Sequence, residues 1–228
     1  MPNVSAYSLS MVLKKTIAII LLFTVTGTNN LFARDKDFGV WLDLAATRKV
    51  RSATIGLMGE FYTLNNSSSI ERTSIGLEGN YSFLPCLNAG VGYLLMNYNH
   101  PAYDELRDRF YFHVEPSWHF SNFFFSFRER LQITLYPETR TSEPNTYYWS
   151  NRFDVCYKNS EWKLEPLINI ESFYLLGDVD LKPFDEFRFM LGANYRLTRN
   201  QSIKFYGLYT DETDLNRCIL GVAYEIKL

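Results

Sequence analysis

The sequence has few residues of the kinds that build metal centres and disulfide frameworks. It contains three histidines and three cysteines, and Cys86, Cys156 and Cys218 lack metal-ligand spacing, so we interpret the cysteines as ordinary strand or turn residues. It also contains no nucleophile elbow and no glycine-rich phosphate loop, so it predicts neither an enzyme nor a metal or cofactor site. The formal net charge of −2 lacks the basic excess that phosphate backbones require, which argues against a nucleic-acid partner.

Long apolar runs are also missing, except near the amino terminus. Two lysines precede an apolar run from Thr16 to Gly27, and Ala33 follows as a small residue at a cleavage position. This is the layout of a secretory signal peptide, and its apolar core is too short to cross a bilayer. We therefore expect residues 1–33 to be removed and residues 34–228 to form one domain.

The sequence is rich in aromatic residues, at 17%, and in strict alternation of apolar with polar side chains. At the carboxyl end, one face of an extended strand would carry Cys218, Leu220, Val222, Tyr224, Ile226 and Leu228. The other face would carry Arg217, Gly221, Ala223, Glu225 and Lys227. An apolar face opposite a charged one predicts a strand between lipid and a watery lumen, as in a bacterial outer-membrane barrel. An amphipathic edge strand of a soluble β-domain is the alternative.

Similar amphipathic runs fill the remainder of the chain and predict an all-β fold. The predicted strands are 37–46, 52–62, 72–83, 87–98, 107–120, 122–135, 146–157, 162–173, 184–197, 201–210 and 216–228. Single-chain bacterial barrels have an even number of strands, so we expect an antiparallel up-and-down transmembrane barrel of ten to twelve strands. Either residues 37–46 lie inside a ten-stranded barrel, or one strand of a twelve-stranded barrel is split or missed.

The lengths of the connections orient the predicted barrel. The connections near residues 84–86, 119–122, 158–160 and 198–200 are short, and those near residues 65–70, 100–106, 136–145, 175–183 and 211–215 are longer. Short turns typically face the periplasm and long loops face the outside, which agrees with a periplasmic carboxyl terminus. We interpret the loops at 136–145 and 175–183 as solvated segments, with a receptor surface as the alternative.

Several short motifs resemble one protein family. They are Asp37-Phe38-Gly39-Val40-Trp41, Arg109-Phe110-Tyr111, Phe127 to Gln132, Asn151-Arg152-Phe153, Leu164-Glu165-Pro166 with Glu171 and Phe173, and Arg188 with Gly192 and Tyr195. With these motifs the chain resembles the outer-membrane barrels grouped as Domain of Unknown Function 2490. The resemblance implies a barrel in the outer membrane of a Gram-negative bacterium, without known catalytic residues. Gly221, Tyr224 and Ile226 also resemble the signal that the barrel-assembly machinery reads.

Sorting the strand residues by parity places most charges on one face, the predicted lumen. The predicted lumen-lining residues are Arg109, His113, Glu115, Arg128, Arg130, Arg152, Asp154, Glu165, Glu171, Arg188, Arg196 and Lys204. Their excess of arginine predicts a narrow, passive, porin-like channel that favours anions. If the mixed charges instead pair across the lumen and fill it, the protein is a structural or assembly-related barrel without conductance.

A lipid-modifying barrel enzyme is the third reading, because Glu115, Ser117 and His119 alternate on one face. Side chains two apart on one strand rarely align as nucleophile and base, so we interpret both His113 and His119 as polar lumen residues. Glu129 falls on the apolar face, where we expect a bulge or a depth that lets it join the neighbouring arginines. We expect a monomer whose partners are outer-membrane lipid and the barrel-assembly machinery.

Overall fold

The computed structural model describes residues 36–101, 103–136, 144–177, 184–212 and 215–228. The predicted signal peptide, residues 1–33, lies outside them, as do parts of the two longest loops. The described strands are β1 (Lys36–Val50), β2 (Ala53–Leu64), β3 (Ser69–Leu84), β4 (Leu87–Asn99), β5 (Asp104–Phe120), β6 (Phe123–Leu135), β7 (Thr146–Tyr157), β8 (Leu164–Leu176), β9 (Phe184–Arg196), β10 (Gln201–Glu212) and β11 (Asn216–Lys227). Among the described residues, no helix is long and apolar enough to cross a bilayer.

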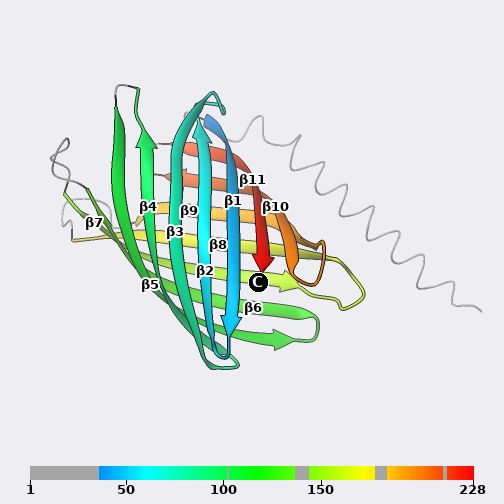
Figure 1. The fold of residues 1–228 in the computed structure, drawn as a ribbon. Coiled ribbons are helices and arrows are strands. Elements are labelled where there is room, and N and C mark those ends of the chain that lie inside the picture. Colours follow the sequence, from blue (N-terminus) through cyan, green and yellow to red (C-terminus); the bar gives the residue numbers. More distant parts are fainter. Residues whose placement is uncertain (1–35, 102, 137–143, 178–183, 213–214) are drawn as a thin grey trace, which may run out of the picture. The chain divides into compact units, whose positions relative to one another are not determined.

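The eleven strands form one closed barrel in which each strand pairs with its neighbours in the chain. The closing pair differs from the others because β1 runs parallel to β11, from Lys36 opposite Asn216 to Thr47 opposite Lys227 (Figure 1). The expected barrel of ten to twelve strands is confirmed, with eleven described strands. Neither way of making the number even applies, because residues 37–46 belong to the wall of an odd-numbered barrel. With an odd number, the first and last strands point the same way, so the barrel closes through a parallel pair.

Burial is inverted relative to a soluble domain. The outward side chains Ile55, Leu57, Ile75, Leu77 and Val91 are 49% to 61% exposed. The inward side chains Thr134, Ser150, Asn169 and Thr210 are at most 4% exposed. The apolar face is not packed against a second sheet, which excludes the soluble sandwich and agrees with the alternation in the sequence.

Apolar side chains fill part of the barrel interior. They form two clusters, one of Leu94, Met96 and Tyr111 and one of Tyr206, Leu208 and Ile219. Each cluster contains a tyrosine whose ring covers a glycine on the neighbouring strand, Tyr111 over Gly92 and Tyr206 over Gly221. Since a side chain at either glycine would overlap the ring, these glycines make room for the aromatic filling of the narrow interior.

The two ends of the barrel differ as the sequence predicted at most connections, but the β7–β8 connection, predicted to be short, is longer than the β10–β11 connection, predicted to be long. The short-turn end has connections at 51–52, 85–86, 121–122, 158–163 and 197–200, and the long-loop end has connections at 65–68, 100–103, 136–145, 177–183 and 213–215. Arg51 and Ser121 have positive φ angles of 57° and 53°, which suits the two-residue hairpins they belong to. The carboxyl terminus lies at the short-turn end and the start of β1 lies at the long-loop end.

Glu129 departs from expectation, because it causes no bulge and does not join the arginines. The register between β5 and β6 is the same on both sides of this region, with Val114 opposite Glu129 and Ser117 opposite Ser126. The pairing is interrupted at Pro116, which has no N–H to donate. Glu129 therefore stays on the outward face, exposed, while its neighbours Arg128 and Arg130 point inward.

Candidate functional site

The barrel interior contains two chambers that meet at one arginine. The long-loop chamber, about 370 Å³, lies toward the long-loop end and is lined by Arg72, Arg109, Arg130, Glu171 and Arg188, among others. The short-turn chamber, about 600 Å³, lies toward the opposite end and is lined by Asp43, Asp154, Glu165, Lys204 and Glu225, among others. Arg152 lines both chambers, so its side chain lies at the partition between them.

Ion pairs within β7 and between strands two apart in the wall hold this partition in place. Arg152 Nε lies 2.8 Å from Asp154 Oδ2, and Arg152 Nη2 lies 3.7 Å from Glu115 Oε2. On the adjacent strands, Arg128 Nη2 donates to Glu171 Oε1 at 2.7 Å. Because both arginines are paired with carboxylates, the partition is a polar layer held by ion pairs rather than by a single unpaired side chain.

Most other arginines of the long-loop chamber are also paired. Arg72 donates to Glu60 at 2.9 Å and to the Tyr98 hydroxyl at 3.1 Å, and its guanidinium carbon lies 4.4 Å from the centroid of the Tyr62 ring. Arg188 donates to both carboxylate oxygens of Glu186, at 2.7 and 2.9 Å. These bonds satisfy the charges internally and stiffen the wall of the chamber.

Two arginines of the same chamber have no carboxylate within ion-pair distance among the described residues. Arg109 donates from Nε to the Thr134 hydroxyl at 3.1 Å. Arg130 lies over the Tyr111 ring, with 4.2 Å from its guanidinium carbon to the ring centroid, and its buried Nε has no hydrogen-bond partner. Both line the chamber, so their remaining N–H groups are available to an anion that enters it.

In the short-turn chamber, the charges follow a different pattern. Asp43 accepts hydrogen bonds from the hydroxyls of Tyr206, at 2.9 Å, and Tyr62, at 3.1 Å, with no ion pair to a described base. The ammonium of Lys204 lies 5.1 Å from the centroid of the Tyr206 ring. Neither Lys204 nor Asp43 forms a salt bridge with a described residue. The two therefore contribute one positive and one negative charge to the chamber, which has no strong preference for anions or cations.

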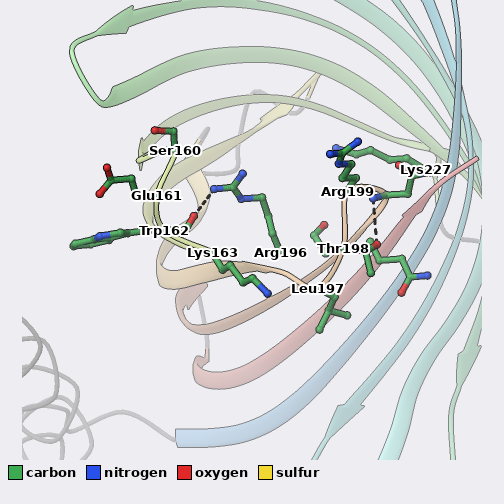
Figure 2. Close-up of a pocket in the computed structure, with 12 residues that line it drawn as sticks. Ser160, Glu161, Trp162, Lys163, Arg196, Leu197, Thr198, Arg199 and Lys227 are labelled. Carbon is green, nitrogen blue, oxygen red and sulfur yellow. Dashed lines mark hydrogen bonds between the residues drawn. The ribbon is translucent and has the colours of Figure 1, made fainter.

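A further pocket of about 590 Å³ opens at the short-turn end, between the β7–β8 loop and the β9–β10 turn (Figure 2). The basic residues Lys163, Arg196, Arg199 and Lys227 line it, together with the single acidic residue Glu161. In Figure 2 the Arg196 guanidinium reaches across to donate to the backbone carbonyl of Trp162. Arg196, Ser202 and Lys227 also line the short-turn chamber, so this basic pocket adjoins the mouth of the lumen.

All twelve predicted lumen residues lie on the inner side of the wall. The long-loop chamber is lined by Arg109, Arg128, Arg130, Glu171 and Arg188, the partition is formed by Glu115, Arg152 and Asp154, and the short-turn chamber is lined by Glu165, Arg196 and Lys204. His113 is buried beside Tyr111, with 6.1 Å between ring centroids. Strand alternation therefore identifies which side of the wall a residue occupies, but not the chamber it lines.

The sequence prediction missed several inward charges, most of them acidic. The long-loop chamber is lined by seven arginines (Arg72, Arg109, Arg128, Arg130, Arg152, Arg188 and Arg217) and by six carboxylates (Glu60, Glu71, Glu171, Asp185, Glu186 and Glu212). The excess is thus one positive charge, smaller than the predicted excess of arginine suggested. Asp43 was missed because the position of the first strand was left open between the lumen and the wall. Glu212 was missed because the predicted strand ended at residue 210, whereas β10 extends to Glu212. Glu186 was not selected although it has the same parity as Arg188.

The serine and histidine considered for lipid chemistry do not form a catalytic pair. Ser117 is buried opposite Ser126, whereas His119 is exposed and its ring lies 4.8 Å from that of Phe124. No hydrogen bond joins them within the described strands. Nor do the described residues bring three histidine, cysteine or carboxylate side chains together in a group that could hold a metal ion.

These features define the class of the protein: a closed β-barrel with an apolar outer face and a charged interior. The family model described as "Protein of unknown function (DUF2490)" matches residues 38–218, and the chain belongs to this family. Among solved structures, the chain is similar to the β domain of the Bordetella autotransporter BrkA, with 9% sequence identity and a TM-score of 0.41. That match covers 78% of this chain and 82% of the other. No curated protein matches the sequence.

Proposed function

We propose that the protein spans the bacterial outer membrane as a β-barrel, inserted by the barrel-assembly machinery. The apolar outer face supports this location, and so do aromatic side chains near both ends of the strands. Trp118, Phe120 and Phe123 are exposed near the short-turn end, and Tyr147 and Trp149 are exposed near the long-loop end. Rings at these positions suit the two interfaces of a bilayer, where they form the aromatic girdles typical of such barrels.

Within this membrane the barrel acts as a narrow passive channel. The observation that carries this proposal is that a polar chamber opens toward each end and that both chambers reach Arg152. A solute crosses when Arg152 shifts away from Asp154 and Glu115 and joins the chambers. Arg109 and Arg130, which lack carboxylate partners, give the passage a weak preference for anions. The proposal includes no enzymatic step and no cofactor.

Ion conductance of the refolded protein in a planar bilayer tests the channel. We expect Arg152→Ala to raise the single-channel conductance and Arg109→Gln with Arg130→Gln to lower the anion preference. Arg48→Gln controls for the loss of one positive charge outside the lumen, because Arg48 is exposed near the end of β1. If neither the wild-type protein nor Arg152→Ala conducts ions, the channel proposal is contradicted.

A structural barrel without conductance is the second candidate. The two apolar clusters around Tyr111 and Tyr206 and the Arg128–Glu171 ion pair occupy the middle of the interior, which favours a closed lumen. This candidate predicts electrical silence, together with increased permeability of the outer membrane to large antibiotics when the gene is deleted. Deletion without such leakage, combined with conductance in the bilayer, would favour the channel.

A further inference from the structure

One charged side chain, that of Glu129, lies on the outer face of the barrel, where the acyl chains of a membrane offer no hydrogen-bond partner. Glu129 is the seventh of the thirteen residues of β6, and it is exposed. It forms no hydrogen bond or ion pair with any described residue. The other outward carboxylates of the described strands lie nearer to strand ends, and one of these, Asp108 in β5, accepts a hydrogen bond from the Tyr93 hydroxyl at 2.6 Å. In the proposed membrane location, Glu129 is therefore a charge that faces lipid and has no partner among the described residues of its own chain.

Glu129 belongs to a row of polar residues that crosses three strands. It lies opposite Asn151 of β7, and Asn151 lies opposite Ser172 of β8. All three face outward in the middle part of the wall, and we call them the outer polar row. The side chains of Asn151 and Ser172 form no hydrogen bond within the described chain, so the row presents an unused acceptor next to unused donors.

A hollow of about 390 Å³ surrounds Glu129 on the same face. It is lined by Phe112 and Val114 of β5, Arg130 and Leu131 of β6, Trp149 of β7 and Leu176 of β8. An indented apolar surface around a polar centre has the composition of a contact site rather than of a smooth lipid-facing wall.

We propose that a second copy of this chain covers the outer polar row, so that the barrel forms a dimer in the membrane. This inference rests on the proposed membrane location, and it replaces the expectation of a monomer. Acyl chains cannot hydrogen-bond a carboxylate or an amide, so the row is costly against lipid and is stabilised by a protein partner.

Membrane insertion determines the symmetry of such a pair. All copies enter the membrane in the same direction, so a two-fold axis between them runs along the membrane normal and brings together residues at similar depth. Glu129 and Asn151 are neighbours in register and lie at similar depth. The axis therefore places the Glu129 carboxylate of each copy against the Asn151 amide of the other, which gives two reciprocal hydrogen bonds.

Cross-linking between two differently tagged copies in lipid vesicles tests this geometry. One copy carries Glu129→Cys and the other Asn151→Cys, both in a background in which Cys86, Cys156 and Cys218 are replaced by serine. The control pairs Leu77→Cys with Asn151→Cys, because Leu77 is also outward and central but lies on β3 and is 56% exposed. We expect a disulfide-linked hetero-pair for the first combination and little for the control. Equal yields, or a cross-link to a different protein, would overturn the dimer.

The strength of association gives a second readout. Energy transfer between labelled copies should show that Glu129→Leu weakens dimerisation by about tenfold, as expected for the loss of two membrane hydrogen bonds. Glu129→Gln keeps an acceptor and should stay near the wild type. Heat-modifiable electrophoretic migration reports insertion separately. Failure to insert would overturn the membrane location and the dimer with it, whereas full insertion without association would overturn the dimer alone.

Discussion

Arg128 and Glu171 form an ion pair inside the barrel, with 2.7 Å between Nη2 and Oε1 and 9% exposure of each side chain. They belong to a row of four charges across neighbouring strands, because Arg128 lies opposite Arg152, Arg152 opposite Glu171, and Glu171 opposite Arg188. One carboxylate thus lies among three guanidinium groups at the middle of the lumen, and that of Arg128 is the one within ion-pair distance. Arg152 and Arg188 have further carboxylates of their own, so the Glu171 carboxylate is the one on which Arg128 depends.

Removal of this carboxylate should destabilise the barrel strongly. Glu171→Gln leaves Arg128 buried without a counter-charge, and the loss of one partner of a buried pair costs about 3–5 kcal/mol. Urea unfolding of the protein refolded into lipid vesicles measures this change in the free energy of unfolding.

Glu165→Gln is the matched control for this experiment. Glu165 lies 3.2 Å from Arg196, whose side chain is 44% exposed, so water replaces the lost partner. We expect a cost below about 1 kcal/mol. Equal costs for the two variants would show that the Glu171 site is hydrated and that the lumen is more open than a packed interior.

Gly221 should tolerate no side chain. The ring of Tyr206 covers it from the neighbouring strand, and a Cβ would overlap that ring. Gly221→Ala forces Tyr206 to move and loosens its hydrogen bond to Asp43, so we expect a loss of about 1–3 kcal/mol in unfolding free energy. Gly207→Ala serves as the control, because a Cβ at Gly207 meets open space, and unchanged stability of Gly221→Ala would contradict the packing argument.

Strand alternation predicted the sides of the wall because it depends on a local period of two residues. The stretches from Leu87 to Tyr98 and from Thr146 to Tyr157 agree closely with β4 and β7, and Arg128 and Glu171 lie inside as expected. The way the barrel closes was not predictable from this pattern. A strand such as β1 shows the same alternation whether its neighbour is parallel, antiparallel or absent. Alternation also gives no information on which side chains pair with each other across the lumen.

Arg72 should not be replaceable by lysine. Its planar guanidinium bonds Glu60 and Tyr98 together and lies over the Tyr62 ring, whereas an ammonium presents no flat face and no fork of donors. We expect Arg72→Lys to lower the unfolding free energy by about 1–2 kcal/mol, as judged from the loss of one charged hydrogen bond and of the ring contact. A matched Arg48→Lys change outside the lumen should have no effect, and equal behaviour of the two variants would argue against a structural role for the stacking.

In the proposed outer-membrane location, the parallel closure predicts that β1 begins and β11 ends on opposite sides of the membrane. The start of β1 is tied to the long-loop end, where the Asp37 carboxylate accepts hydrogen bonds from the backbone amides of Asn65 and Asn66 at 3.1 and 2.7 Å. At the other end, the native Cys86 is exposed in the β3–β4 turn. A membrane-impermeant maleimide should therefore label Ser68→Cys in intact cells, because Ser68 is exposed in the β2–β3 connection. It should label Cys86 only after the outer membrane is permeabilised, and labelling of Cys86 in intact cells without a gain from Ser68→Cys would mean that the barrel is inserted the other way round.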